Sequence, residues 1–63
     1  MNRGEKRILI VDDEEYFTAL VKMSLEKINM YDVMVENKGA RGLEAAKRFQ
    51  PDLILLDLSM ADM

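Results

Sequence analysis

Two short apolar runs that end in aspartate decide the fold, ILIVDD at residues 8–13 and LILLD at residues 53–57. Continuously apolar runs of this length are typical of strands that are covered on both faces of a parallel sheet. The carboxyl ends of parallel strands lie at one edge of the sheet, where ligands bind in such folds. If the two strands are neighbours, we expect the carboxylates of Asp12, Asp13 and Asp57 to converge at that edge.

Between these runs, the spacing of apolar residues changes to that of helices. The first strand is expected from Arg7 to Asp12, and the following segment from Asp13 to Asn29 has an apolar stripe at intervals of three and four. The members of this stripe are Phe17, Leu20, Val21, Ser24, Leu25 and Ile28. Lys22 and Glu26 lie four apart on the exposed face and are expected to interact weakly.

The second half of the chain repeats the pattern. A turn at 30–32 leads to a short strand at 33–35, and a second helix opens at Gly39 and ends before Pro51, since proline disfavours helical geometry at the preceding residue. Its expected inner face consists of Ala40, Leu43, Ala46 and Phe49. The third strand spans 53–56. The order β-α-β-α-β with short connections predicts an α/β fold with a parallel three-stranded sheet and right-handed crossovers.

Composition limits the classes of protein and of site. The chain has 63 residues, of which 49% are hydrophobic and 33% charged, so it forms one globular domain at most. It has no cysteine and no histidine, which excludes disulfides, thiolate sites and imidazole chemistry and leaves oxygen ligands. Neither a membrane span nor the apolar segment of a signal peptide is present, so we expect a cytoplasmic protein without a membrane partner.

The net charge of −3 is unevenly distributed. Five of the 12 acids lie near the expected edge, namely Asp12, Asp13, Glu14, Glu15 and Asp57, so the remainder of the chain is slightly basic. The basic residues are scattered and do not form a stripe with interleaved aromatics, which argues against nucleic-acid binding. The pairs Lys6-Arg7 and Lys47-Arg48 are interpreted as solvated surface, and Asp52 and Asp62 as solvated turn acids.

Together these residues resemble the first half of a bacterial response-regulator receiver domain. The resemblance rests on ILIVDDEE, the amphipathic helix after it, the ending FQPDLILLDLSMADM, and the 45-residue separation of Asp12 and Asp57, and it covers residues 6–63. It implies half of a flavodoxin-like fold with strand order 2-1-3. Residues 1–63 would then be a truncated receiver domain with no output domain. Ala61 stands where the family's loop has proline.

The resemblance also implies roles for individual residues in a two-component phosphorelay. Asp57 matches the phosphoacceptor, whose donor is a histidine kinase. Asp12 and Asp13, with Asp57 and the backbone carbonyl of Ser59, match the ligands of Mg²⁺. Such a cation prefers carboxylate and water oxygens, and it lowers the repulsion between an anionic nucleophile and a phosphoryl donor. The chain is then a phosphoacceptor protein rather than an enzyme, with weak phosphorylation from small donors.

Other interpretations of the same acids stay open. Asp13, Glu14 and Glu15 can cap the first helix and complement its positive end, and Asp57 can be an ordinary turn residue. The chain can also be a non-signalling half-domain that folds as a homodimer through its third strand, with phosphotransfer lost. Haloacid-dehalogenase phosphatases fit less well, because Ser59 occupies the place of their second aspartate, and Toprim nucleases need a D-x-D pair that the chain lacks.

Overall fold

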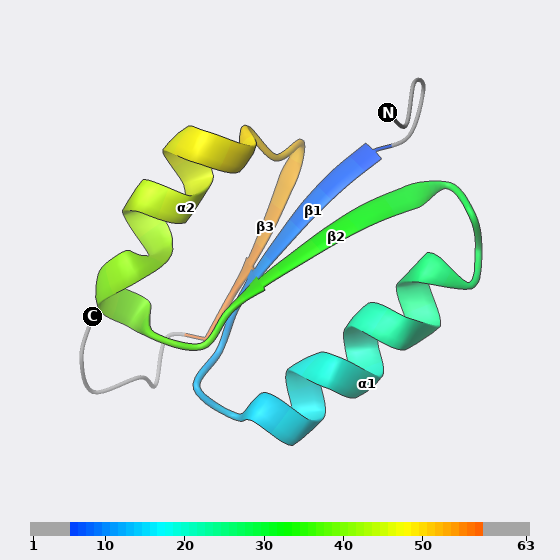
Figure 1. Ribbon diagram of the computed structural model, residues 1–63, viewed down its shortest axis with the longest axis horizontal. Coiled ribbons are helices and arrows are strands. Elements are labelled where there is room, and N and C mark those ends of the chain that lie inside the picture. Colours follow the sequence, from blue (N-terminus) through cyan, green and yellow to red (C-terminus); the bar gives the residue numbers. More distant parts are fainter. Residues whose placement is uncertain (1–5, 58–63) are drawn as a thin grey trace.

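The computed structural model describes residues 6–57, which form a parallel sheet with one helix on each face (Figure 1). The elements are β1 (Lys6–Val11), α1 (Glu15–Glu26), β2 (Tyr31–Glu36), the 3₁₀ turn η1 (Gly39–Arg41), α2 (Gly42–Phe49) and β3 (Leu53–Leu56). The strand order is β2-β1-β3, and both pairings are parallel. The predicted α/β class, the β-α-β-α-β order and the strand order 2-1-3 are therefore confirmed.

The ends of several elements differ from the predicted ones. The second strand begins at Tyr31, where a turn was expected, because Tyr31 and Asp32 pair with the first two residues of β1. The first helix is shorter at both ends than the predicted 13–29. A turn at residues 12–14 precedes it, and Asn29 adopts a left-handed conformation with φ of 66° after it.

Successive side chains of β1 point to opposite faces of the sheet, so this strand packs against both helices. Ile8 and Ile10 form a cluster with Val33, against which Val21 and Leu25 of α1 pack. The alternate residues of β1, Leu9 and Val11, form a cluster with Ala45 of α2 on the other face, and Phe49 packs against it. All four apolar residues of this run are buried because each face of β1 has a helix over it.

The inner face of the second helix was predicted only in part, because Ala46 and Phe49 pack inward as expected but Ala40 and Leu43 are exposed. Ala45 is fully buried, whereas Leu43 is 70% exposed. The residues facing the sheet are Gly42, Ala45, Ala46 and Phe49, which share a helical stripe at spacings of three, four and seven. A Cβ at Gly42 would lie 3.3 Å from Val11 Cγ1, so the first turn of α2 lies very close to β1. Small residues therefore determine which side of this helix packs inward.

The first helix also packs differently from its predicted stripe. Val21 and Leu25 are half-buried as expected, but Phe17, Leu20 and Ile28 are each about half exposed. The most buried residue of α1 is the polar Thr18, at 1% exposure. Its hydroxyl donates to the carbonyl of Glu15 at 3.0 Å, which allows it to be buried without an unsatisfied polar group.

Arg7 is a half-buried anchor rather than solvated surface, contrary to the prediction. Its Nη1 donates to the carbonyl of Phe49 at 2.8 Å, and its guanidinium lies 5.3 Å from the centre of the Phe49 ring. Its backbone N–H donates to Asp52 Oδ2 and its carbonyl accepts the Asp52 N–H, both at 2.7 Å. Asp52 is exposed, as expected of a turn acid, yet it ties the start of β3 to β1.

The predicted pair of Lys22 and Glu26 is present, with 2.8 Å between Nζ and Oε2. The hydrogen bond from Lys22 lowers the pKa of the Glu26 carboxyl group. The same ammonium donates to the carbonyl of Val33 at 2.9 Å, which links α1 to β2. Because both side chains are about 40% exposed, this pair contributes little to stability.

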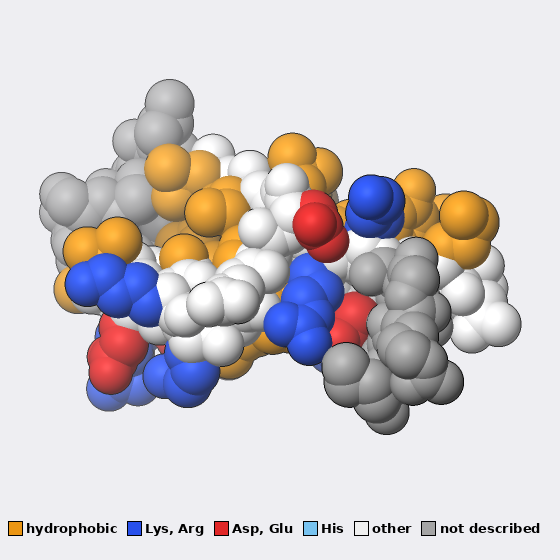
Figure 2. Space-filling model, turned by 90° about the horizontal axis from the view of Figure 1, so that it is seen from above, with side chains coloured by type: hydrophobic (Ala, Val, Ile, Leu, Met, Phe, Trp, Pro, Cys, Tyr) orange, Lys and Arg blue, Asp and Glu red, His pale blue; other side chains and the backbone are white. Residues whose placement is uncertain are grey.

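The surface of the molecule carries both apolar and charged side chains. In the view of Figure 2, hydrophobic side chains reach the surface in patches, and lysine and arginine side chains lie among acidic ones. Within residues 6–57, no helix combines the length and the apolar character needed to cross a bilayer.

Candidate metal centre

Three carboxylates meet where β1 and β3 end. Asp12, Asp13 and Asp57 each offer a carboxylate oxygen, and these oxygens all lie within 4.8 Å of one another. The pairing of Val11 with Leu56 places the ends of the two strands side by side, and the N–H of Asp57 donates to the carbonyl of Val11 at 3.0 Å. The predicted convergence is therefore observed, whereas the roles of these residues as ligands and nucleophile stay predictions.

Asp12 is held by its neighbours on several sides. Its N–H donates to the carbonyl of Glu36 at 3.1 Å, which continues the pairing of β1 with β2. Its Oδ1 accepts the N–H of Glu14 at 3.0 Å, and its carbonyl accepts a hydrogen bond from Asn37 Nδ2 at 2.8 Å. The half-buried Asp12 is thus oriented in advance, so little conformational entropy would be lost when it binds a ligand.

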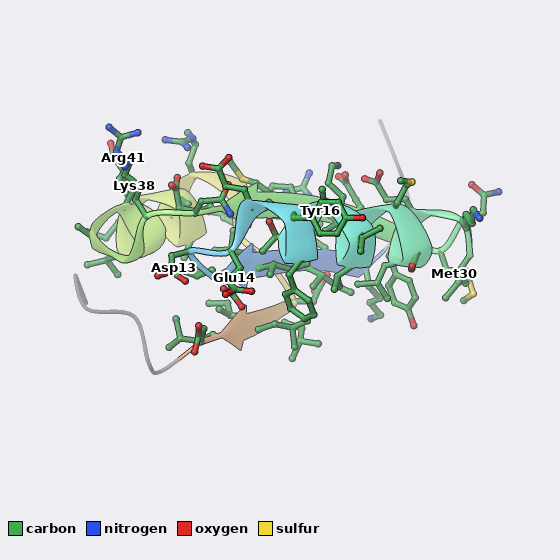
Figure 3. All side chains as sticks on the ribbon, turned by 90° about the horizontal axis from the view of Figure 1, so that it is seen from below. Asp13, Glu14, Tyr16, Met30, Lys38 and Arg41 are labelled. Carbon is green, nitrogen blue, oxygen red and sulfur yellow. The ribbon has the colours of Figure 1, made fainter. Side chains whose placement is uncertain are left out.

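Asp13 is more open to solvent than its two partners. Figure 3 shows it beside Glu14 in the connection from β1 to α1, with its carboxylate at the surface, whereas Tyr16 lies further along α1. It is exposed, and Asp57 is half-buried. An exposed carboxylate next to two half-buried ones leaves a side from which a hydrated ion can enter.

The capping interpretation of the acids holds only in part. Glu14 is the N-cap residue of α1, but its side chain makes no cap hydrogen bond. Glu15 lies in the first turn, where its charge complements the positive end of the helix. Asp13 has no hydrogen bond assigned to its side chain among the contacts of residues 6–57, so capping does not account for its position.

The three acids line an open cavity of about 670 Å³. The remainder of its wall is formed by Glu14 and by apolar residues of the sheet and α1, namely Ile10, Phe17, Val21, Leu55 and Leu56. A second groove of about 370 Å³ lies between α2 and β3, and its lining has no ionisable side chain. Of the two, only the first combines charge with enough space for an ion and a small anion.

The donor set of this cavity fits a hard divalent cation. Carboxylate oxygens bind Mg²⁺ at about 2.0–2.1 Å, so ligands on opposite sides of the ion lie about 4 Å apart. The oxygens of Asp12, Asp13 and Asp57 are at most 4.8 Å apart, so small side-chain rotations or an intervening water would bring them to one ion. Without a cation, three clustered carboxylates repel one another, which makes such an ion stabilising.

Ser59, predicted to offer its carbonyl to the ion, and Ala61 lie outside the described residues. Asn37, directly after β2, was not among the predicted site residues, yet its amide donates to the carbonyl of Asp12 at 2.8 Å. The sequence did contain a signal for this contact, namely an amide side chain directly after a strand whose carboxyl end lies at the same sheet edge as the acids.

Comparison with known proteins supports the same family as the motifs. Residues 8–63 match the model of the response regulator receiver domain. The chain is 42% identical over 55 residues to the alkaline phosphatase synthesis transcriptional regulatory protein PhoP of Bacillus subtilis, covering 87% of this chain and 22% of that protein. It is 40% identical over 58 residues to the chemotaxis protein CheY of the same organism, covering 90% of this chain and 48% of that protein.

A third relative is the response regulator ArlR of Staphylococcus saprophyticus, with 44% identity over 57 residues, which cover 90% of this chain and 26% of that protein. The chain therefore spans less than half the length of each of these relatives. Its three parallel strands in the order β2-β1-β3 form part of the flavodoxin-like receiver fold. With 56 of its 63 residues matched, the chain belongs to the response regulator receiver domain family of two-component signalling.

Proposed function

We propose that this chain is the phosphoacceptor module of a cytoplasmic two-component phosphorelay, with Asp57 as the nucleophile and Asp12 and Asp13 as ligands of Mg²⁺. The observation that carries the proposal is the convergence of the three carboxylates within 4.8 Å at the carboxyl ends of neighbouring strands. Membership of the receiver family supports a histidine kinase as the phosphodonor.

In the proposed reaction, a carboxylate oxygen of Asp57 attacks the phosphorus of a phosphohistidine. The bond from phosphorus to the imidazole nitrogen breaks, the electron pair stays on that nitrogen, and an acyl phosphate forms on Asp57. A Mg²⁺ at the site would neutralise charge on the phosphoryl oxygens and on the attacking carboxylate. The N–H of Glu14 holds the Asp12 carboxylate, and Glu36 and Asn37 hold the backbone of Asp12, so this one carboxylate is oriented before the reaction.

Incubation with a small acyl phosphate tests this proposal without knowledge of the kinase. With Mg²⁺ present, the intact mass should rise by one phosphoryl group per chain, and chelation of Mg²⁺ should prevent that rise. If the folded chain, shown by calorimetry to have Mg²⁺ bound, gains no phosphoryl group, the proposed phosphoacceptor function is wrong.

The alternative of a half-domain that no longer signals is not favoured. The matched family is a signalling family, and the chain has the three acids together at one edge. Self-association does not depend on that alternative.

Mg²⁺ is expected to raise the melting temperature. At a concentration ten times its dissociation constant, a ligand that binds only the folded state stabilises by about 1.4 kcal/mol. For a domain of this size, that corresponds to a shift of about 6–11 °C. Asp13→Ala and Asp57→Ala should each remove the shift, because each deletes one of the three carboxylates. Melting curves by circular dichroism in EDTA and in MgCl₂, at constant ionic strength, measure it.

Glu44→Ala is the matched control, since it removes one exposed carboxylate from α2, outside the acid cluster. This variant should keep the full response to Mg²⁺. An equal response in the wild type and in both aspartate variants would contradict a shared metal site.

We also propose that two copies pair through β3. This strand is an edge of the described sheet, and its four apolar residues are 40–51% exposed. Exposed apolar edges recruit other strands. A two-fold axis normal to the sheet would make the two β3 strands antiparallel and produce a six-stranded sheet. The two acidic centres would then lie at opposite ends of the central pair and would not merge.

Leu55→Lys is expected to convert the dimer to a monomer, because it places a charge in the centre of the proposed interface. Sedimentation equilibrium at high micromolar concentration gives the mass of each form. Leu20→Lys, a change of the same kind at a 45% exposed position of α1, should remain dimeric. A wild-type chain that sediments as a folded monomer, or a mass unchanged by Leu55→Lys, would rule out pairing through this edge.

A further inference from the structure

We propose that Asn37 is a positioning residue that holds the metal-binding loop through the peptide between Asp12 and Asp13. This inference rests on the proposed function, since it concerns the same cation site. Asn37 directly follows β2, 25 residues along the chain from Asp12, and it is half-buried.

The amide of Asn37 makes two hydrogen bonds from one nitrogen. Its Nδ2 donates to the carbonyl of Asp12 at 2.8 Å and to the hydroxyl oxygen of Thr18 at 3.0 Å. The hydroxyl in turn donates to the carbonyl of Glu15. A single side chain therefore connects the end of β2, the loop after β1 and the first turn of α1.

The carbonyl that Asn37 contacts is part of the metal site's own backbone. The carbonyl of Asp12 and the N–H of Asp13 belong to the same peptide group, which is planar. When the Asp12 carbonyl is held, the orientation of this peptide plane is held too, and with it the position of the Asp13 backbone nitrogen. The N–H of Asp12 is already held by Glu36, so consecutive residues at the end of β2 hold both polar groups of the Asp12 backbone.

This arrangement matters most for Asp13. Asp12 has a hydrogen bond to its own carboxylate, from the N–H of Glu14, whereas no hydrogen bond is assigned to the exposed carboxylate of Asp13 among residues 6–57. Its direction toward Asp12 and Asp57 therefore depends on its backbone. Groups that orient metal ligands in this indirect way commonly change metal affinity by about 10–100-fold when they are removed.

Two variants separate a positioning role from a merely structural one. Asn37→Ala removes both hydrogen bonds, whereas Thr18→Val removes the hydroxyl and leaves the bond from Asn37 to Asp12 available. Both should lower the melting temperature in EDTA, since each disturbs the link between β2 and α1. Titration calorimetry with MgCl₂, at a temperature where circular dichroism shows each variant folded, then gives the dissociation constant.

We expect Asn37→Ala to raise the dissociation constant for Mg²⁺ by about tenfold or more, and Thr18→Val to change it by less than about threefold. Asn37→Ser keeps a shorter donor and should fall between Asn37→Ala and the wild type, and it replaces Asn37→Ala if that variant does not fold. The inference is overturned if the Asn37 variants bind Mg²⁺ as tightly as the wild type, or if Thr18→Val weakens binding equally. A wild type that binds no Mg²⁺ overturns the proposed metal site itself.

Discussion

An Asp57→Asn variant is expected to gain no phosphoryl group from a small acyl phosphate in the presence of Mg²⁺, whereas the wild type gains one. The substitution keeps the size of the side chain and its capacity to accept hydrogen bonds, but an amide oxygen is a far weaker nucleophile than a carboxylate. The backbone pairing of residue 57 with Val11 is unaffected by the change, so the sheet should persist. Intact-mass spectrometry measures the adduct directly.

Asp52→Asn is the matched control for this experiment. Asp52 lies just before β3, at the other end of the strand from Asp57, and asparagine retains an oxygen that can accept the N–H of Arg7. This variant loses one negative charge but keeps Asp57, so it should gain the phosphoryl group as the wild type does. A phosphoryl group of equal abundance on Asp57→Asn would place the nucleophile elsewhere, and an equal loss in both variants would attribute the effect to charge.

Leu9→Ala is expected to cost about 2–5 kcal/mol of folding free energy, the range for truncating a buried leucine. Leu9 is fully buried in the central strand, in a cluster with Val11 and Ala45. A domain of about 60 residues buries only about 60% of its unfolded surface and is marginally stable, so this loss should leave most of the variant unfolded at 25 °C. Urea denaturation followed by circular dichroism gives the difference.

Leu43→Ala removes the same atoms from a residue that is 70% exposed, and it should change stability by less than about 0.5 kcal/mol. Leu9→Val is a smaller truncation and should fall between the two. Unfolding of Leu9→Ala and Leu43→Ala at the same urea concentration would contradict the described packing of α2 against the central strand.

The strands could be predicted from the sequence because a strand covered on both faces needs an uninterrupted apolar run. Residues 8–11 and 53–56 are such runs, and both were placed correctly as strands. The expected cover on both faces is observed only for β1, since the four residues of β3 are 40–51% exposed. The side of α2 that packs inward could not be predicted in the same way. Two stripes were available in this short helix, and the observed one begins at Gly42, where the helix lies too close to Val11 for an ordinary side chain. Close approach of two elements is a property of the folded state.

The buried Thr18 and the half-buried Arg7 illustrate a second limit. Arg7 was interpreted as solvated surface, and nothing in the sequence predicted that Thr18 is buried, since burying a polar side chain without a partner is costly. Both side chains have partners that are distant in sequence or supplied by the helix backbone, namely the carbonyl of Phe49 for Arg7, and Asn37 and the carbonyl of Glu15 for Thr18. Only the assembled fold makes those partners available.

The candidate site was more accessible to sequence reasoning than the packing. The convergence of Asp12, Asp13 and Asp57 follows from topology alone, since parallel neighbouring strands end at the same edge. The part played by Asn37 depends on how far β2 extends along β1. The pairing of these two strands runs as far as Val11 and Glu36. The residues that directly follow the two strands, Asp12 and Asn37, therefore lie next to each other. The shorter predicted strand at 33–35 gave no reason to expect this contact.

The register of β1 and β3 has a consequence for how this chain can misfold. Val11 pairs with Leu56, and the four leucine and isoleucine side chains of β3 are so alike that apolar burial distinguishes poorly between neighbouring alignments. A slip of one residue would move Asp57 by about 3.3 Å and turn its side chain to the opposite face of the sheet. Such a slipped form would keep its helices and most of its apolar contacts but would have a divided acid cluster. A divalent cation would bind best to the alignment in which all three acids meet. It would therefore stabilise the native strand register over the slipped one.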